Sequence, residues 1–235
     1  MSKNKLKKFS ELEHLQRVIQ PDFKEIFDKD HELKGRWSEQ VFENAHPIVL
    51  ELGCGKGEYT LALAEQDPGR NFIGVDIKGA RIWSGAKTAN ERNMLNVAFL
   101  RTRIEFIRSF FASGEVDEIW ITFPDPQLKR RRNKKRLTGS LFLNSYRAFL
   151  KDNGLIHLKT DNDVLFNYTR ETARFNNLEI VKETSDVYNS DLSDEILSVK
   201  TYYEKRFLEE GSNINYICFS LPSDTILKEL PEHGE

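Results

Sequence analysis

Several features that define whole classes of protein are scarce in this sequence of 235 residues. The two cysteines, Cys54 and Cys218, form no CxxC pair, which argues against a disulfide scaffold or a structural zinc site and is typical of a reducing compartment. The five histidines show no metal-ligand spacing, so no metal is expected. No apolar run is long enough to cross a bilayer, and the basic N-terminus lacks the apolar core of a signal peptide. We therefore expect a cytoplasmic protein with no membrane or metal partner.

An excess of positive charge is also missing. The formal net charge is −2, so a nucleic-acid partner would have to be recognised by a local patch. The length suffices for one substantial α/β domain, and no repeat or linker divides the chain. We expect this domain at residues 36–222, a flexible, mostly disordered basic arm with short helical pieces at residues 1–35, and a loose acidic tail at residues 223–235. The arm either solubilises the protein or, with four lysines among its first eight residues, assists RNA binding.

A buried strand, a glycine-rich turn and a helix follow one another near residue 50. Residues 48–52 are apolar apart from Glu51, and residues 58–66 have helical character. The turn between them contains Gly53, Gly55 and Gly57. Glycines let the backbone turn tightly, approach a ligand and place amides at a helix start. The arrangement indicates a nucleotide-binding α/β unit, and the alternative is an ordinary tight turn before a helix.

The spacing of these glycines differs from two common nucleotide-binding motifs. A dinucleotide fingerprint would need glycine in place of Glu58, and a P-loop would need serine or threonine after Lys56 in place of Gly57. Glu51, at the strand end, is a poor neighbour for pyrophosphate and favours a ligand that carries a cation. The segment at residues 51–57 resembles the first motif of Rossmann-like S-adenosylmethionine-dependent methyltransferases.

Polar residues follow the next three predicted strands, at residues 71–75, 96–100 and 117–123. Asp76 ends the first of them, at the place where an acidic residue commonly accepts hydrogen bonds from ribose hydroxyls; a solvated strand-end aspartate is the alternative. Arg103 follows the second, and we expect it to contact an adenine ring by stacking or through its amide. Glu105 is the alternative for that contact.

Asp125 follows the third of these strands and lies between two prolines. Prolines restrict the backbone on both sides of this carboxylate, and ligands of open parallel sheets bind at the carboxyl ends of strands. Seven of the eight residues from Lys129 to Arg136 are basic. Such a run is usually a solvated face, but its position directly after Asp125, in a chain of negative net charge, indicates a polyanion that docks beside the active site.

The rest of the chain alternates helices with strands. Helices are expected at residues 79–93, 138–151 and 164–175 and from Thr201 onward, and strands at 154–159, 178–183 and 215–221. His157 lies inside a strand and is interpreted as a packed or hydrogen-bonded residue, not as a ligand. The order predicts an α/β fold of the Rossmann-like methyltransferase type, with one doubly wound, mostly parallel, seven-stranded sheet whose last strand is antiparallel.

Five segments in this order resemble the bacterial tRNA (guanine-N7-)-methyltransferase family: ELGCGKG at 51–57, GVD at 74–76, FPDP at 123–126 with the basic run, KTD at 159–161 and TYYE at 201–204. The resemblance implies an S-adenosylmethionine-dependent enzyme that methylates N7 of guanosine in tRNA, at position 46 in the variable loop, and forms 7-methylguanosine. Two positions depart from the family. Gln127-Leu128 stands where Trp-Pro is common, and Arg103 stands where Asp or Asn is common.

The resemblance also implies roles for individual residues. Asp125 would be the catalytic residue. S-adenosylmethionine would be bound by Glu51, Gly53, Gly55, Gly57, Asp76, Arg103 and Asp125. The substrate would be bound by Lys129, Asp161, Thr201, Tyr202, Tyr203 and Glu204. The RNA would be contacted by Arg131, Arg132, Asn133, Lys134, Lys135 and Arg136. The oligomeric state is open between a monomer and a homodimer.

The implied chemistry suits the residue types present. Guanine N7 carries a free lone pair and no proton, so the reaction needs no general base. Rate enhancement can come from alignment of N7 with the methyl carbon, and from carboxylates that stabilise the positive charge gained by the base. Asp125 and Asp161 are the candidate carboxylates, with Glu204 as the third. Cys54 is interpreted as a small residue of the cofactor loop. Two alternatives stay open: a catalytically inactive RNA-binding protein on this fold, and a methyltransferase for a non-RNA substrate.

Overall fold

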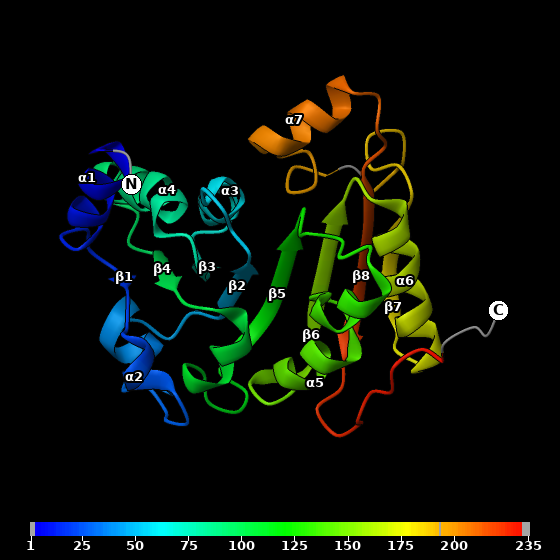
Figure 1. The fold of residues 1–235 in the computed structure, drawn as a ribbon, viewed down its shortest axis with the longest axis horizontal. Coiled ribbons are helices and arrows are strands. Elements are labelled where there is room, and N and C mark those ends of the chain that lie inside the picture. Colours follow the sequence, from blue (N-terminus) through cyan, green and yellow to red (C-terminus); the bar gives the residue numbers. More distant parts are fainter. Residues whose placement is uncertain (1–2, 193, 232–235) are drawn as a thin grey trace.

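A computed structural model describes residues 3–192 and 194–231, which form one sheet with helices on both faces (Figure 1). The strands are β1 (Val18–Ile19), β2 (Ile48–Leu52), β3 (Asn71–Asp76), β4 (Val97–Arg101), β5 (Val116–Thr122), β6 (Leu150–Thr160), β7 (Ile180–Thr184) and β8 (Asn215–Leu221). The helical elements are α1 (Lys3–Leu12), α2 (Phe23–Ile26), the π-helix η1 (Ser38–Phe42), α3 (Glu58–Gln66), α4 (Gly79–Glu91), the 3₁₀-helices η2 (Ile104–Ser109) and η3 (Arg130–Lys135), α5 (Ser140–Tyr146), α6 (Asp163–Phe175) and α7 (Tyr202–Glu209).

The strand order in the sheet is β1-β4-β3-β2-β5-β6-β8-β7. Neighbours from β1 to β6 pair in parallel, whereas β8 runs antiparallel to both β6 and β7. The order reverses between β2 and β5, which is the switch point where open α/β sheets bind ligands beyond the carboxyl ends of their strands. The predicted α/β sheet with an antiparallel last strand is confirmed. An eighth strand, the short β1 beside β4, was not predicted.

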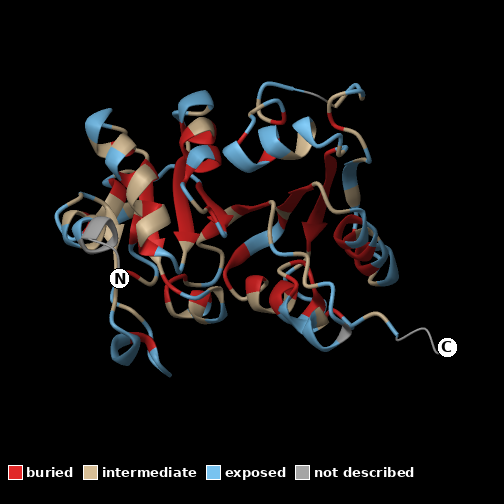
Figure 2. Ribbon diagram, turned by 45° about the horizontal axis from the view of Figure 1, so that its top comes forward, coloured by how far each residue is buried: buried red, intermediate tan, exposed pale blue. Residues whose placement is uncertain are grey.

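Both faces of the central strands are buried, which explains why their sequences are almost continuously apolar. In β5, Ile119 and Ile121 pack in one hydrophobic cluster with side chains of α5 and α6, whereas Trp120 packs in a second cluster with side chains of α3 and α4. Figure 2 shows the strands as a buried centre between helices with exposed outer sides. Glu51 and Asp76 belong to the ends of β2 and β3, where the strands leave this core, so rigid elements hold these two carboxyl groups in place.

The N-terminal segment differs from the flexible, disordered arm that the sequence predicts. Helix α1 packs against α4, Leu12 at its end is fully buried, and the indole N–H of Trp83 donates to Glu11 at 2.8 Å. Strand β1 then pairs with β4, and Ile26 and Leu33 join the core. A few widely spaced apolar residues thus attach a charged segment to the domain. Residues 1 and 2 lie outside the described part of the chain.

The C-terminal tail also packs on the domain where the structure describes it. Leu227 is buried, and its carbonyl accepts a hydrogen bond from Asn144 Nδ2 at 2.9 Å. The Glu229 carboxylate accepts hydrogen bonds from the hydroxyls of Ser140 and Tyr168, each at 2.6 Å. These contacts correct the prediction of a loose tail for residues 223–231, and residues 232–235 lie outside the described part of the chain.

The helix predicted at residues 138–151 is shorter in the structure, because α5 ends at Tyr146 and β6 begins at Leu150. Leu150 pairs with Val116 of β5, and after a bulge the pairing continues at Leu155 and Glu118. Buried pairing at the sheet overrides the local helical pattern here. Strand β6 then runs to the carboxyl edge of the sheet and ends next to Asp161.

Candidate active site

The turn between β2 and α3 has a backbone that favours glycine. Gly53, Gly55 and Gly57 have φ values of 82°, 57° and 73°, all in the left-handed region that other residues rarely adopt. The Gly53 amide donates to the carbonyl of Val75 at 2.8 Å, which ties the turn to the end of β3. A Cβ atom on Gly57 would lie 2.6 Å from the Phe99 ring. The three glycines therefore leave a stretch of backbone without side chains at the switch point of the sheet, where a ligand can approach it closely.

Glu51 lies next to this turn and is almost completely buried. One of its carboxylate oxygens accepts hydrogen bonds from the amide (2.8 Å) and the hydroxyl of Thr60, and the other accepts from the hydroxyl of Thr122 at 2.6 Å. Burial raises the pKa of Glu51 to about 7, although these hydrogen bonds act in the opposite direction. A cationic group bound beside Glu51 would favour its charged form. The site is therefore built to respond to a cationic ligand.

Asp76 ends β3 and holds the shape of the turn. One oxygen of its carboxylate accepts a hydrogen bond from the Gly55 amide at 3.0 Å, and the other accepts from the Lys78 amide at 2.8 Å. Each carboxylate oxygen can accept more than one hydrogen bond, so both keep capacity for hydroxyl donors. Asp76 thus combines a structural contact to the glycine turn with free acceptor sites at the cavity that it lines.

A cavity of about 320 Å³ opens beside Asp76. It is lined by Gly53, Asp76, Ile77, Thr102, Arg103, Ile104, Glu105, Gln127, Lys135, Leu137 and Phe142. Arg103 stands at the rim, where its side chain is 56% exposed and pairs with Glu105 at 3.1 Å. The structure therefore brings three residues predicted to bind the cofactor, Gly53, Asp76 and Arg103, to one cavity.

A second, smaller cavity of about 70 Å³ lies between the glycine turn and the start of α7. Glu51 and Gly53 line it from below, and Thr201 and Tyr203 line it from the α7 side. The Tyr202 amide donates to the carboxylate of Glu58 at 2.8 Å, which fastens α7 to the beginning of α3. Figure 1 shows α7 lying beyond the carboxyl ends of β5 and β6. The segment at residues 201–204 therefore covers the turn from the side opposite the sheet.

A buried ion pair holds this segment in place. The Lys159 ammonium lies 2.7 Å from the Glu204 carboxylate, and both side chains are fully buried. Lys159 also donates to the carbonyls of Leu197 (2.7 Å) and Val199 (3.0 Å), and burial lowers the pKa of Lys159. Glu204, in turn, accepts a hydrogen bond from the Tyr188 hydroxyl at 2.6 Å. Glu204, which the sequence predicts to bind the substrate, thus has Lys159 as its partner inside the protein. By contrast, Thr201 and Tyr203 line the smaller cavity and Tyr202 is exposed.

The role of Lys159 was not assigned from the sequence. A lysine directly after the apolar residues Leu155, Ile156 and Leu158 of β6 is the signal that could have drawn attention to it, because buried lysines are rare unless they are paired. The sequence could not identify Glu204 as the partner of Lys159, because Glu204 is far away in the chain and the position of α7 brings it to Lys159.

Asp125 lies on the loop that connects the two cavities. Its carboxylate is exposed and accepts a hydrogen bond from the Gln127 amide at 3.0 Å. Phe123 lines the smaller cavity, and Gln127 lines the larger one. Both have positive φ values, 47° and 50°, which are uncommon for residues other than glycine and occur often at functional sites. Asp125 lies between Phe123 and Gln127 in the chain, but its own side chain is absent from the lining of both cavities.

Asp161 follows β6 and is half-buried. Burial raises the pKa of its carboxyl group, and the neighbouring charges of Asp163 and Glu210 act in the same direction. A positive charge near Asp161 would relieve this repulsion. Lys129, also predicted to bind the substrate, is exposed at the start of the basic run.

The basic run from Lys129 to Arg136 divides into exposed and buried parts. Arg131, Arg132, Lys134 and Lys135 are exposed and Asn133 is half-buried, all on η3, whereas the side chain of Arg130 lies outside the described part of the structure. Arg136, by contrast, is only 6% exposed. Its Nε donates to the Pro126 carbonyl at 3.2 Å, and its guanidinium lies 4.2 Å from the ring centroid of Tyr168. The structure thus corrects the prediction that Arg136 contacts the RNA. Its side chain is buried and attaches the basic run to the loop that contains Asp125.

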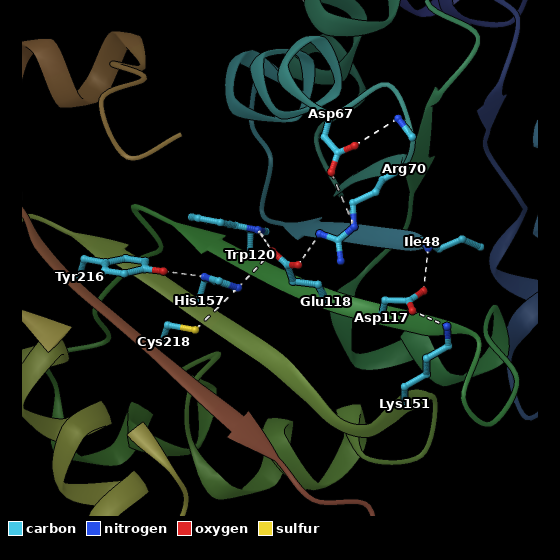
Figure 3. Close-up of polar contacts among 11 residues, drawn as sticks. Ile48, Asp67, Arg70, Asp117, Glu118, Trp120, Lys151, His157, Tyr216 and Cys218 are labelled. Atoms are coloured by element: carbon cyan, nitrogen blue, oxygen red, sulfur yellow. Dashed lines mark hydrogen bonds and ion pairs between the residues drawn. The ribbon is translucent and has the colours of Figure 1, made fainter. Parts of the chain in front are cut away.

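His157 packs within the sheet, as predicted (Figure 3). Its ring stacks on Trp120 at a centroid distance of 4.0 Å, Nδ1 lies 2.8 Å from the Tyr216 hydroxyl, and Nε2 lies 3.1 Å from the Glu118 carboxylate. Burial opposes the charged imidazolium, but hydrogen bonds to Cys218 and Glu118 outweigh it and raise the pKa of His157 to about 9. The ring is absent from the lining of both cavities.

Comparisons with known proteins agree with this geometry. Residues 45–217 match the model of a family described as "Putative methyltransferase". The tRNA (guanine-N(7)-)-methyltransferase of Bacteroides thetaiotaomicron is 50% identical over 97% of this chain and 90% of its own length. The enzyme of the same name from Christiangramia forsetii is 52% identical over 94% of this chain and 99% of its own length.

This chain belongs to the tRNA (guanine-N(7)-)-methyltransferase family. Among solved structures, the 16S rRNA methyltransferase KamB superposes with a TM-score of 0.63 at 15% sequence identity, over 88% of this chain and 99% of KamB. At that identity the likeness shows the methyltransferase fold alone.

The family fold gathers predicted site residues from separate parts of the chain at one edge of the sheet. They come from the turn after β2, the ends of β3 and β6, the loop after β5, and the start of α7. Between residues 3 and 231, with position 193 left aside, no three His, Cys, Asp or Glu side chains are grouped as a metal ion would need. In the same part of the chain, every helix is too short or too polar to span a membrane.

Proposed function

We propose that this protein acts in the cytoplasm and transfers a methyl group from S-adenosylmethionine to N7 of guanosine at position 46 of tRNA. The observation that carries the proposal is the placement of three features around one loop. The loop after β5 contributes Phe123 to the smaller cavity, beside the glycine turn and the buried Glu51, and it continues through Asp125 to the exposed basic residues of η3. The names of the two relatives at about half identity support the substrate and the position of the methyl group.

The residues around the two cavities fit S-adenosylmethionine. The turn offers a bare backbone at Gly53 and Gly55, Asp76 keeps acceptor capacity for ribose hydroxyls, and Glu51 carries a buried carboxyl group that a cation would ionise. The proposed binding set is Glu51, Gly53, Gly55, Gly57, Asp76 and Arg103, and Asp125 lies beside the cofactor, where it acts mainly on the base. When bound, the cofactor supplies a methyl group that its sulfonium sulfur has already activated.

The chain's own residues contribute position and charge. Thr201 and Tyr203 restrict access of water to the smaller cavity because they cover it from the α7 side. Alignment of the guanine with the methyl group then supplies much of the rate enhancement, because N7 needs no deprotonation. Asp125 stabilises the positive charge that the base gains during the reaction. Asp161, whose carboxyl group already lies among negative charges, contributes to the same stabilisation from the end of β6.

Substrate and RNA contacts complete the proposal. Lys129, Asp161, Thr201, Tyr202 and Tyr203 hold the substrate guanosine directly, whereas Glu204 supports them through its buried pair with Lys159. The exposed residues Arg131, Arg132, Asn133, Lys134 and Lys135 hold tRNA phosphates. Such contacts position an RNA without reading its sequence, so the choice of base falls to the pocket.

Methyl transfer from labelled S-adenosylmethionine into unmodified tRNA, followed by nucleoside analysis, tests this function. We expect label in 7-methylguanosine and its loss with a transcript in which G46 is replaced by A. Asp125→Ala should abolish transfer while the Kd for S-adenosylmethionine stays within about threefold, because Asp125 acts on the base. Label in another nucleoside, or label that persists in the A46 transcript, would refute the base assignment. Near-normal turnover of Asp125→Ala would refute its charge-stabilising role.

A further inference from the structure

A second group of basic side chains lies beside the smaller cavity, away from η3. We call it the α1/α4 surface, and its members are Lys7 and Lys8 of α1, Lys56 of the glycine turn, Lys78 directly before α4, and Arg81 and Lys87 of α4. Lys56 and Arg81 line the smaller cavity, and α1 packs on α4. The surface therefore begins at the cavity and continues along α4 and α1.

The α1/α4 surface and η3 belong to opposite layers of the fold. Leu12 of α1 and Ile82 of α4 pack in the hydrophobic cluster on one face of the sheet. Leu137, which follows the basic run, packs against the cluster on the other face, and Arg136 joins the run to Tyr168 of α6. In Figure 1, α1 and α4 lie to the left of β5, and α6 lies to its right. Basic side chains thus flank the cavities from both layers.

The positive charge of the α1/α4 surface is only partly neutralised within the protein. Lys7 and Lys87 each pair with a glutamate one turn along their own helix, at 3.7 and 3.6 Å, and such exposed pairs are weak. Among the residues that the structure describes, no carboxylate pairs with Lys56, Lys78 or Arg81. The surface can therefore attract a polyanion although the whole chain carries a net charge of −2.

Aromatic rings alternate with the cations on this surface. Four of the cations lie over rings: Lys8 and Lys87 over Trp83 (4.4 and 5.2 Å), Lys56 over Tyr202 (4.3 Å) and Arg81 over Tyr203 (5.9 Å). Trp83 is half-buried, and Tyr202 and Tyr203 are exposed. Proteins that bind unpaired nucleic-acid strands combine positive charge along the backbone with aromatic rings on which bases stack. The mixture of rings and cations favours RNA over an acidic protein, which would need the charge alone.

We propose that the α1/α4 surface is a second RNA-contact surface, an inference that rests on the proposed function. The tRNA crosses the cavities and is held from both layers of the fold. Lys7, Lys78 and Lys87 contact its phosphates, and Trp83 contacts an unpaired base. Anchoring by η3 alone would leave the RNA free to pivot about one point. Two anchors on either side of the cavities fix the direction of the strand, which aligns the target base with the methyl group.

Titration of unmodified tRNA at several salt concentrations tests the inference. The triple variant Lys7→Gln/Lys78→Gln/Lys87→Gln should raise the Kd at low salt by about tenfold. It should also reduce the slope of log Kd against log salt by about 2–3, because each lost phosphate contact contributes about 0.7–0.9. The matched control removes the same charge from exposed positions at the amino end of β6, on β7 and in the tail, as Lys151→Gln/Lys182→Gln/Lys228→Gln. It should change both quantities much less.

Trp83 gives a direct readout of contact, because the other two tryptophans, Trp37 and Trp120, are buried. Binding of tRNA should protect the fluorescence of the wild type from quenching by acrylamide, and this protection should be lost in Trp83→Phe. The basic triple variant should show the same protection only at a higher tRNA concentration, in step with its raised Kd.

Three results would overturn the inference. The first is a Kd and a salt slope that stay at wild-type values in the basic triple variant, with methyl transfer into tRNA intact, which would leave the proposed function standing. The second is a control variant that weakens binding as much as the basic triple variant does, because net charge alone would then act. The third is protection of Trp83 by raised protein concentration in place of tRNA, which would assign the surface to a second copy of this chain. A wild-type protein that bound no tRNA would overturn the proposed function as well.

Discussion

Glu51 makes the affinity for S-adenosylmethionine dependent on pH. In the ligand-free protein, burial raises the pKa of Glu51 to about 7, so the carboxylate form makes up about 90% at pH 8 and about 10% at pH 6. A cationic ligand binds the carboxylate form and lowers this pKa, so binding releases a proton. Between pH 8 and pH 6 the Kd should therefore rise by about tenfold, which is the ratio of the two carboxylate fractions before rounding.

Isothermal titration calorimetry measures both quantities in one series. Repeating the titration at pH 7 in buffers of different ionisation enthalpy should show release of about half a proton per ligand, because about half of Glu51 is then protonated. Glu51→Gln is the control, since it removes the titrating group and keeps the shape of the side chain. Titration of the ligand's own amino group is common to both proteins and cancels in the comparison.

Two results would refute this reasoning. A wild-type Kd that stays constant from pH 6 to pH 8 would mean that Glu51 does not face a positive charge of the ligand. A tenfold change that persists in Glu51→Gln would assign the titration to another group. In either case the buried carboxyl group would have a structural role, set by its bonds to Thr60 and Thr122.

Three further predictions concern the surrounding structure. Lys159→Met should lower the free energy of unfolding in urea by about 3–5 kcal/mol, because it leaves a buried carboxylate unpaired; a loss below about 1 kcal/mol would contradict the ion pair. Arg131→Ala combined with Arg132→Ala should weaken tRNA binding and reduce the slope of log Kd against log salt by about 2, whereas Lys182→Ala on the far edge strand should change neither. The pKa of His157 is raised to about 9, so its stabilising effect is fully present below pH 6.5 and is lost as the pH rises through 9. The free energy of unfolding of the wild type should therefore fall by roughly 1–3 kcal/mol between pH 6.5 and pH 9. A His157→Phe variant that shows the same decrease would contradict the assignment to His157.

The local elements of the site could be predicted from the sequence because their causes are local. A short apolar run, three glycines and a helical pattern lie side by side in residues 48–66, and the strand-end positions of Asp76 and Asp125 follow from the same periodicity. Parallel strands place their carboxyl ends at one edge, so the gathering of these residues was expected from their order alone. The packed role of His157 also followed from its place inside an apolar strand.

Other features depended on partners that are distant in the chain. The seven basic residues of the run look alike in the sequence, but among those whose side chains the structure describes, it is Arg136 that meets the Tyr168 ring and the Pro126 carbonyl. The N-terminal segment is polar on average, and a single helix face with Leu12 attaches it to α4. The average composition of such a segment indicates its solubility, but it does not show which of its few apolar side chains pack against the rest of the domain.

The sequence by itself determined the fold class, the family and the set of strand ends that carry the site. Only the tertiary structure decided which of those polar residues face a ligand and which face each other. It paired Glu204 with Lys159 inside the protein, and it buried Oγ1 of Thr102 and Oε1 of Gln127 with no hydrogen-bond partner in the described part of the chain. The physical reason is that the free energy of a polar side chain depends on its burial and its partner, and both are set by elements far away in the chain.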